Sequence, residues 1–324
     1  MKIATAAYPI DWHNRWNDYV GKLRVWVRTA RDQGADLLVF PEYASMELAS
    51  LAEEKYARDL ALSIEAVTAR LGDVDSLHAS LAREFGVHIC AASAPIKRAG
   101  RLPANRARLF GPDGTMGVQD KLIMTRFERD EWNIGAGDGL ALFETALGKI
   151  GILICYDAEF PLLARRLVEA GAEILLVPSC TDTLQGYSRV RVGAMARALE
   201  GQCIVVHAAT IGNAKWLTAL DANVGAAAIY APPDGEFPDT GVIAEGKLGE
   251  PGWVFGEVDL GDVRAIREAG TVLNVQHWPE QEAGGGTAEV ETVNLLATET
   301  SPPQSDAATV EDDEATSQSS APSG

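Results

Sequence analysis

Short apolar segments that alternate with longer helical ones constrain most strongly how this chain can fold. Residues 36–40, Asp-Leu-Leu-Val-Phe, form a strand-length apolar run that ends at Pro41. The order gives about a dozen strands with helical crossovers, which predicts an α/β fold with helix-covered sheets rather than a bundle or a β-sandwich. We expect further strands at residues 3–7, 87–92, 105–110, 116–120, 149–155, 174–177, 203–207, 226–230 and 254–258, and helices at 15–33, 57–85, 161–170 and 187–200.

The length of 324 residues, 47% of them apolar, allows one large α/β domain or two small ones. We expect the folded body to span residues 1–282. From Ala283 on, the sequence is mostly Gly, Thr, Glu, Ser, Pro and Ala. Such a segment cannot bury enough surface to offset the entropy lost on ordering, so residues 283–324 are predicted to be a disordered acidic tail.

The charge of the chain is strongly negative, with a formal value of −18. Eight acidic residues and no basic residue lie in the tail, and the body remains acidic without them. An acidic surface repels the nucleic-acid backbone and anionic membranes, so we expect no nucleic-acid and no membrane partner. The N-terminal segment resembles an export signal, but Pro9 interrupts it and Asp11 ends it, so we interpret it as a first strand and expect a cytoplasmic protein.

The four cysteines stand alone rather than in Cys-x-x-Cys pairs. This argues against a zinc site and against a dense disulfide framework, and we expect reduced thiols and no metal. The sequence contains neither a Walker A motif nor a Gly-x-Gly-x-x-Gly fingerprint after a strand, so no nucleotide cofactor is expected. The cysteines are Cys90, Cys155, Cys180 and Cys203.

Cys155 has the sequence context of a nucleophile. The apolar run Gly151–Ile154 leads directly to the thiol, and polar residues follow it before Pro161, which can open a helix. The thiol is therefore predicted at the carboxyl end of a strand, where α/β proteins place reactive groups and where backbone N–H groups can hold an oxyanion. The pattern alone is equally compatible with a small buried residue.

A thiol nucleophile needs a base, and no histidine of this chain lies in a motif that suits that role. A carboxylate can serve instead if burial raises its pKa, and Glu42 follows the apolar run 37–40 and Pro41 directly. Lys121 follows the strand expected at 116–120, and a fixed cation there would stabilise a negative oxygen. Taken alone, Glu42 could be a solvated loop residue and Lys121 a surface lysine.

Taken together and in this order, these segments resemble the nitrilase, or carbon-nitrogen hydrolase, superfamily, whose catalytic set is Glu, Lys and Cys. The likeness extends from residue 1 to about residue 262 and is closest to the amidase branches, because true nitrilases more often carry Cys-Trp-Glu. The motifs are Pro41-Glu42, Asp120-Lys121-Leu122 and Gly151–Pro161 with Cys155-Tyr156-Asp157 at its centre, and further matches are Leu176–Ser179, Ala196–Glu200 and Pro232–Gly235.

The resemblance implies a four-layer α-β-β-α sandwich without a cofactor, and a homodimer or higher homo-oligomer in which the dimer forms through the helices expected at 161–170 and 187–200. It also implies a second glutamate that positions the lysine, for which Glu128, seven residues after Lys121, is favoured over Glu131. From closeness to the motifs we expect substrate contacts from Tyr43, Trp132, Tyr156 and Thr181.

For activity the resemblance implies hydrolysis of a non-peptide C–N bond in a small linear amide through a thioester on Cys155. The alternatives are nitrile or carbamoyl hydrolysis, acyl transfer to an amine, and a non-catalytic binding protein on the same fold. The family often has Lys-x-His-Leu-x-Pro in its second motif, but here residues 122–126 lack the His and the Pro, so an ordinary family substrate should not be assumed.

Overall fold

Strand β2 (Leu37–Val39) shows why its sequence is apolar at every position. In this computed structural model, which describes residues 1–286, 288–293 and 295, β2 is buried on both faces. Leu37 and Val39 belong to one hydrophobic cluster, whereas Leu38 and Phe40 belong to another. Side chains alternate along a strand, so the run supplies two cores at once.

One continuous hydrogen-bonded path joins most of the strands, in the order β5-β4-β3-β2-β1-β9-β8-β7-β6. β13 pairs with β1, and β10 and β11 pair with β9. The strands are β1 (Lys2–Pro9), β2, β3 (His88–Arg98), β4 (Arg101–Phe110), β5 (Met116–Asp120), β6 (Leu142–Thr145), β7 (Gly148–Ile152), β8 (Ile174–Cys180), β9 (Ile204–Asn213), β10 (Ala222–Asn223), β11 (Ala228–Tyr230), β12 (Val242–Glu245) and β13 (Gly252–Glu257).

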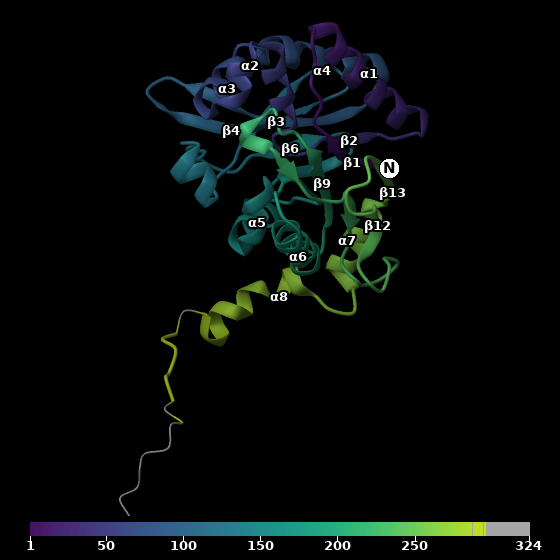
Figure 1. Cartoon of the computed structure of the whole chain (residues 1–324). Coiled ribbons are helices and arrows are strands. Elements are labelled where there is room, and N and C mark those ends of the chain that lie inside the picture. Colours follow the sequence, from purple (N-terminus) through teal and green to yellow (C-terminus); the bar gives the residue numbers. More distant parts are fainter. Residues whose placement is uncertain (287, 294, 296–324) are drawn as a thin grey trace, which may run out of the picture. The chain divides into compact units, whose positions relative to one another are not determined.

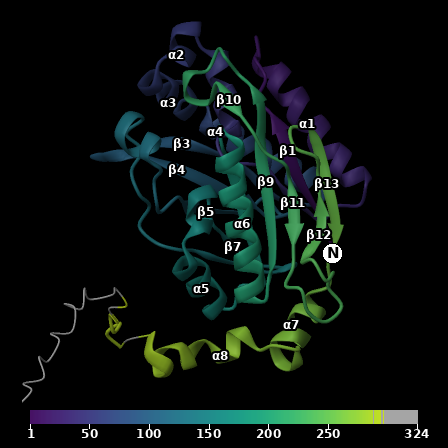
Figure 2. The same ribbon diagram turned by 60° about the horizontal axis from the view of Figure 1, so that its bottom comes forward.

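Helices cover both sides of these strands, which confirms the predicted α-β-β-α arrangement. Figure 1 shows α1 to α4 over strands β1 to β4, and α5 and α6 on the opposite side, beyond β6 and β9. Figure 2 shows α6 running alongside β9. The α-helices are α1 (Trp16–Asp32), α2 (Glu54–Arg58), α3 (Leu60–Thr68), α4 (Leu71–Phe85), α5 (Pro161–Glu169), α6 (Leu184–Gly201), α7 (Leu260–Ala269) and α8 (Asn274–Gln281); the short 3-10 and π turns are η1 (Ala44–Leu51), η2 (Phe127–Glu131), η3 (Cys155–Glu159), η4 (Thr218–Leu220) and η5 (Glu282–Gly286).

The two ends of the strand path approach each other, so the sheet is nearly a closed barrel. The side chain of Gln119 on β5 accepts a hydrogen bond from the Ala141 N–H at 2.8 Å and donates one to the Gly139 carbonyl at 2.9 Å. Both partners lie within the three residues before β6. Side-chain bonds thus span the gap that the backbone ladder leaves between β5 and β6.

The pairing directions bring the carboxyl ends of several strands to the same edge. β2 is parallel to β1 and β3, β9 is parallel to β1 and β8, and β7 is parallel to β8. β5 is antiparallel to β4, which is antiparallel to β3, so β5 also ends at this edge. Glu42, Lys121 and Cys155 follow the ends of β2, β5 and β7, so the fold places all three candidate residues together.

Some local expectations were wrong. The helix expected at 57–85 is three helices, because Asp59 caps a new one by accepting a hydrogen bond from the Leu62 N–H at 2.8 Å. β3 and β4 also extend into a hairpin that closes at Gly100, where φ is +67°. A glycine suits this left-handed turn because it has no Cβ. The turn η1 was not expected from the sequence.

The chain separates into one compact unit, Met1–Pro279, and a second, Glu280–Gly324. The tail predicted for residues 283–324 lies mostly outside the described residues, so its disorder stays a prediction. Within the described part of the chain, no helix is long and apolar enough to cross a membrane. All four cysteines are free thiols.

Leu176 on β8 lies fully buried in the larger core cluster, so its truncation should destabilise the fold. Leu176→Ala should lower the free energy of unfolding by about 2–5 kcal/mol, because it removes buried methyl groups and leaves a cavity. Urea denaturation followed by circular dichroism measures this. Leu102→Ala, at a side chain that is 53% exposed, is the control and should change stability by about 0.5 kcal/mol or less. Equal effects of the two variants would contradict the assignment of this core.

Candidate active site

Lys121 lies at the centre of a buried group of charges. Its ammonium Nζ is 2.8 Å from Glu42 Oε1, and 2.9 and 2.7 Å from Oε1 and Oε2 of Glu128. All three side chains are at most 3% exposed. Buried ions are tolerated only when they are paired and hydrogen-bonded, and this arrangement supplies both conditions.

Glu128, rather than Glu131, is the second glutamate at Lys121. The π turn η2 directs Glu128 inward and leaves Glu131 exposed. Glu128 also accepts hydrogen bonds from the Tyr43 hydroxyl at 2.7 Å and from the N–H and hydroxyl of Thr125, both at 2.9 Å. Its carboxylate is therefore held from three directions.

Glu42 is fixed through both its backbone and its side chain. Its carbonyl accepts a hydrogen bond from Thr210 Oγ1 at 2.6 Å, and its Oε2 accepts one from the Cys180 N–H at 2.9 Å. The next residue, Tyr43, has a φ of +56°, and its N–H donates to Ser93 Oγ at 3.0 Å. A left-handed conformation at a bulky residue is strained and is retained where the surroundings enforce it.

Cys155 stands on a sharp turn beyond β7, as its sequence context suggested. It is the first residue of η3, with a φ of +50°, and its thiol is 3.7 Å from the Cys180 carbonyl. None of the hydrogen bonds found among the described residues uses the N–H of Tyr156. That N–H therefore remains available to an oxygen bound beside the thiol.

The electrostatic environment keeps the thiol neutral and the lysine charged. Burial and then the Glu42 carboxylate raise the pKa of Cys155 well above its usual value, against the opposing effect of Lys121. Burial lowers the pKa of Lys121, but Glu128 and Glu42 outweigh it and raise that pKa well above the usual value. A protonated thiol attacks only if a base removes its proton.

Glu42 has the properties of such a base. Burial raises its pKa to about 7, opposed by the charge and hydrogen bond of Lys121 and supported by the charge of Glu128. Burial likewise acts to raise the pKa of Glu128, but the charge and hydrogen bond of Lys121 lower it. One glutamate is thus poised to exchange a proton near neutral pH while the other stays ionised.

Asp157 connects the segment after Lys121 to the turn that carries Cys155. Its buried carboxylate accepts the N–H groups of Ile123 at 2.8 Å, of Leu122 at 3.2 Å and of Ile154 at 3.3 Å. Burial raises its pKa to about 6, although Lys121 and these N–H groups lower it. One side chain therefore holds the segment after Lys121 against the residue before Cys155.

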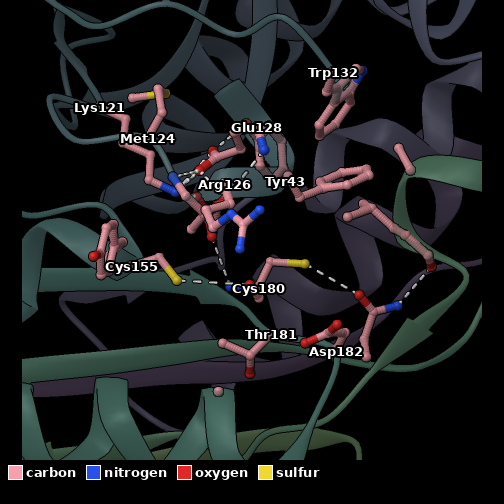
Figure 3. Close-up of a pocket in the computed structure, with 18 of the residues that line it drawn as sticks. Tyr43, Lys121, Met124, Arg126, Glu128, Trp132, Cys155, Cys180, Thr181 and Asp182 are labelled. Carbon is pink, nitrogen blue, oxygen red and sulfur yellow. Dashed lines mark hydrogen bonds and ion pairs between the residues drawn. The ribbon is translucent and has the colours of Figure 1, made fainter. Parts of the chain in front are cut away.

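The site opens into a pocket of about 880 Å³. Figure 3 shows Lys121 close to Glu128, with Cys155 and Cys180 below them in the view and Tyr43 and Trp132 to one side. All four residues expected to contact substrate line this pocket, but Tyr43 and Trp132 are buried against each other with ring centroids 4.8 Å apart. Tyr156 and Thr181 are partly exposed.

The sequence interpretation did not single out several residues of this site. Cys180 lines the pocket and donates its backbone N–H to Glu42, and Arg126, Asp182 and Arg189 lie around the opening. Asn105 donates its side-chain amide to Glu42 Oε1 at 2.8 Å. A lone asparagine inside a strand pattern was the available signal for Asn105, whereas nothing local marks the others.

Comparison with known proteins identifies the family of this chain. The family model described as carbon-nitrogen hydrolase matches residues 2–268. A Bacillus subtilis protein named "Probable hydrolase YhcX" is 37% identical over 276 residues, which cover 85% of this chain and 53% of YhcX. The omega-amidase NIT2 of Danio rerio is 25% identical over 260 residues, covering 78% of this chain and 86% of NIT2. This chain thus spans about half the length of YhcX.

A solved structure shows the same fold. The crystal structure of a carbon-nitrogen hydrolase from Helicobacter pylori G27 matches with a TM-score of 0.67 at 18% identity, over 83% of this chain and 92% of that chain. The chain belongs to the carbon-nitrogen hydrolase family of the nitrilase superfamily, as the sequence motifs indicated.

The Asp157 bridge makes a testable contribution to stability. In Asp157→Asn an amide NH2 would face backbone N–H groups, and the loss of an acceptor for a buried donor should lower the free energy of unfolding by about 1–3 kcal/mol. Denaturant titration measures the change. Asp182→Asn is the matched control, because Asp182 is exposed and makes no side-chain hydrogen bond within the described ranges. Equal stability of Asp157→Asn and the native protein would refute the bridging role.

Proposed function

We propose that this protein hydrolyses the C–N bond of a small linear amide through a thioester on Cys155, releasing a carboxylic acid and ammonia or an amine. The observation that carries the proposal is the buried group in which Lys121 contacts both Glu42 and Glu128 beside the thiol. A base, a fixed cation and a nucleophile are the groups that acyl transfer requires.

In the first half of the reaction, Glu42 takes the proton of the Cys155 thiol as sulfur forms a bond to the carbonyl carbon. Lys121 and the Tyr156 N–H stabilise the negative oxygen of the tetrahedral intermediate. The C–N bond then breaks, the proton on Glu42 passes to the departing nitrogen, and the acyl group remains on sulfur. Glu128 keeps Lys121 charged and in place throughout.

In the second half, water replaces the amine. Glu42 removes a proton from a water molecule as its oxygen attacks the thioester carbon, and the same two donors hold the oxyanion. The C–S bond breaks, the carboxylic acid leaves, and the proton on Glu42 returns to the thiolate. Each proton taken by Glu42 is given back, so the residues of this chain complete the cycle.

Two observations favour an amide over a nitrile as the substrate. The nucleophile lies in Cys155-Tyr156-Asp157, the sequence of the amidase branches, and the related Danio rerio protein is an omega-amidase. The pocket, about 880 Å³ with Arg126, Asp182 and Arg189 around its opening, leaves room for a polar acyl group.

We include in the proposal a domain of residues 1–282 and a cytoplasmic location, which suits four free thiols.

Ammonia release tests the proposal with a panel of small primary amides, carbamoyl compounds and nitriles. The native protein should release ammonia from amides in preference to nitriles, and Cys155→Ala should lose at least about 10³-fold in turnover because the site residues act as a unit. Cys203→Ala, which removes a buried thiol outside the pocket, is the matched control and should keep its activity. Turnover that survives in Cys155→Ala would rule out the thioester, and nitrile-only turnover would rule out the amide preference.

We also propose that two copies associate through α5 and α6. Large apolar side chains stand exposed on these helices, with Leu162 at 69% and Val192 at 63%. Along α6, the spacing of Leu184, Val192 and Leu199 places all three on one face. An exposed apolar stripe on neighbouring helices is typical of a surface that another protein covers.

Light scattering after gel filtration tests the association. The native chain should elute at twice the monomer mass, and the double variant Leu162→Glu, Val192→Glu should elute as a monomer, because charge in an apolar interface is unfavourable. Leu248→Glu, at a side chain 49% exposed between β12 and β13, is the control and should leave the mass unchanged. A native monomer would contradict the proposal.

A further inference from the structure

Asn105 occupies an unusual position for an uncharged polar residue. It lies on β4 between Ala104 and Arg106, with no exposed surface, and its amide Nδ2 is 2.8 Å from Glu42 Oε1. Its Oδ1 has no hydrogen-bond partner within the described ranges. The amide is therefore held through its NH2 group, which donates a hydrogen bond to Glu42.

The same residue also fixes Lys121 through its backbone. The Asn105 carbonyl accepts the Lys121 N–H at 2.8 Å, so β4 positions the residue that follows β5. Asn105 thus contacts both members of the Glu42–Lys121 pair, one with its side chain and one with its main chain.

The two oxygens of Glu42 have different surroundings as a result. Oε1 accepts hydrogen bonds from Lys121 Nζ and Asn105 Nδ2, both at 2.8 Å, which occupy its two lone pairs. Among the residues that the structure describes, Oε2 accepts one hydrogen bond, from the Cys180 N–H at 2.9 Å, which leaves one lone pair free. Only Oε2 can take up a proton without losing a hydrogen bond already present.

We infer that Asn105 is a positioning residue that confines proton exchange to Oε2 of Glu42 and favours the ionised form of this glutamate. The inference rests on the proposed role of Glu42 as the base. With both lone pairs of Oε1 occupied, the proton from Cys155 goes to Oε2 as sulfur attacks, and it leaves from Oε2 to the departing nitrogen. Asn105 itself exchanges no proton and does not line the pocket.

An asparagine suits this position for a physical reason. Its amide donates at every working pH, whereas an aspartate of the same shape would place a third carboxyl group beside Glu42 and Glu128. The charged and titratable groups that face Glu42 are Lys121 after β5, Glu128 on η2, Cys155 on η3, Cys180 on β8 and Tyr43 beside it in the chain. Loss of the neutral Asn105 donor beside these groups disfavours the charged form of Glu42.

Alkylation of Cys155 by iodoacetamide tests the inference without the natural substrate. The sulfur forms a bond to the methylene carbon, iodide leaves, and Glu42 takes the thiol proton. Peptide mass mapping distinguishes Cys155 from the other three thiols. For the native protein, the rate should rise with pH through a midpoint near 7, because Glu42 accepts a proton only when it is ionised.

In Asn105→Leu the midpoint should move up by about one to two pH units, which is the expected effect of losing a hydrogen bond to a charged group. Asn105→Asp, which keeps the shape of the side chain, should also move it upward, and it decides the question if the leucine variant does not fold. Ala107→Gly is the control, because Ala107 lies two residues along β4 from Asn105, on the same face and equally buried. The alkylation midpoint of this variant should stay at the native value.

The outcomes separate the two claims. A native protein whose alkylation shows no midpoint between pH 5 and 9 would overturn Glu42 as the base and, with it, the proposed function. A native midpoint that stays unchanged in Asn105→Leu and Asn105→Asp would overturn the role of Asn105 alone. A midpoint that moves equally in Ala107→Gly would also overturn it, because packing rather than the donor would then be the cause.

Discussion

The ion pairs of Lys121 with Glu42 and Glu128 are the interaction on which the rest of the site depends. An ammonium group and two carboxylates with almost no exposed surface are stable only as a set, because removing one leaves an uncompensated buried charge. The three residues come from different segments, after β2, after β5 and on η2. The charges therefore tie these segments to one another and give the Cys155 thiol fixed surroundings.

Those surroundings explain two strained backbone positions. Tyr43 and Cys155 both have positive φ values; Tyr43 follows Glu42 directly, and Cys155 lines the same pocket. Such conformations persist where neighbouring contacts enforce them. At Tyr43, the backbone N–H donates a hydrogen bond to Ser93. Near Cys155, the Asp157 carboxylate accepts hydrogen bonds from the N–H of Ile154, which precedes Cys155, and from the N–H of Ile123. Glu42 and Cys155 both line the pocket.

Much of the fold followed from local sequence patterns. Apolar strands such as 37–39 and amphipathic helices such as 161–169 lie where their periodicity indicated, because burial at regular intervals is a property of the segment itself. The break at Asp59 and the hairpin at Gly100 were missed, because a cap and a turn depend on single residues. The motifs also indicated Glu42, Lys121 and Cys155, but only in combination, since each has an ordinary structural role when considered alone.

The sequence by itself determined the alternation of strands and helices, the family and the order of the reactive residue types along the chain. Only the tertiary structure decided which glutamate pairs with Lys121, that Asn105 donates to one oxygen of Glu42, and that Asp157 joins the segment after Lys121 to the residue before Cys155. These features depend on hydrogen bonds between residues far apart in sequence, 63 positions in the case of Asn105 and Glu42. Such contacts leave no periodic signal along the chain, because they form only where strand pairing brings separate segments to the same edge.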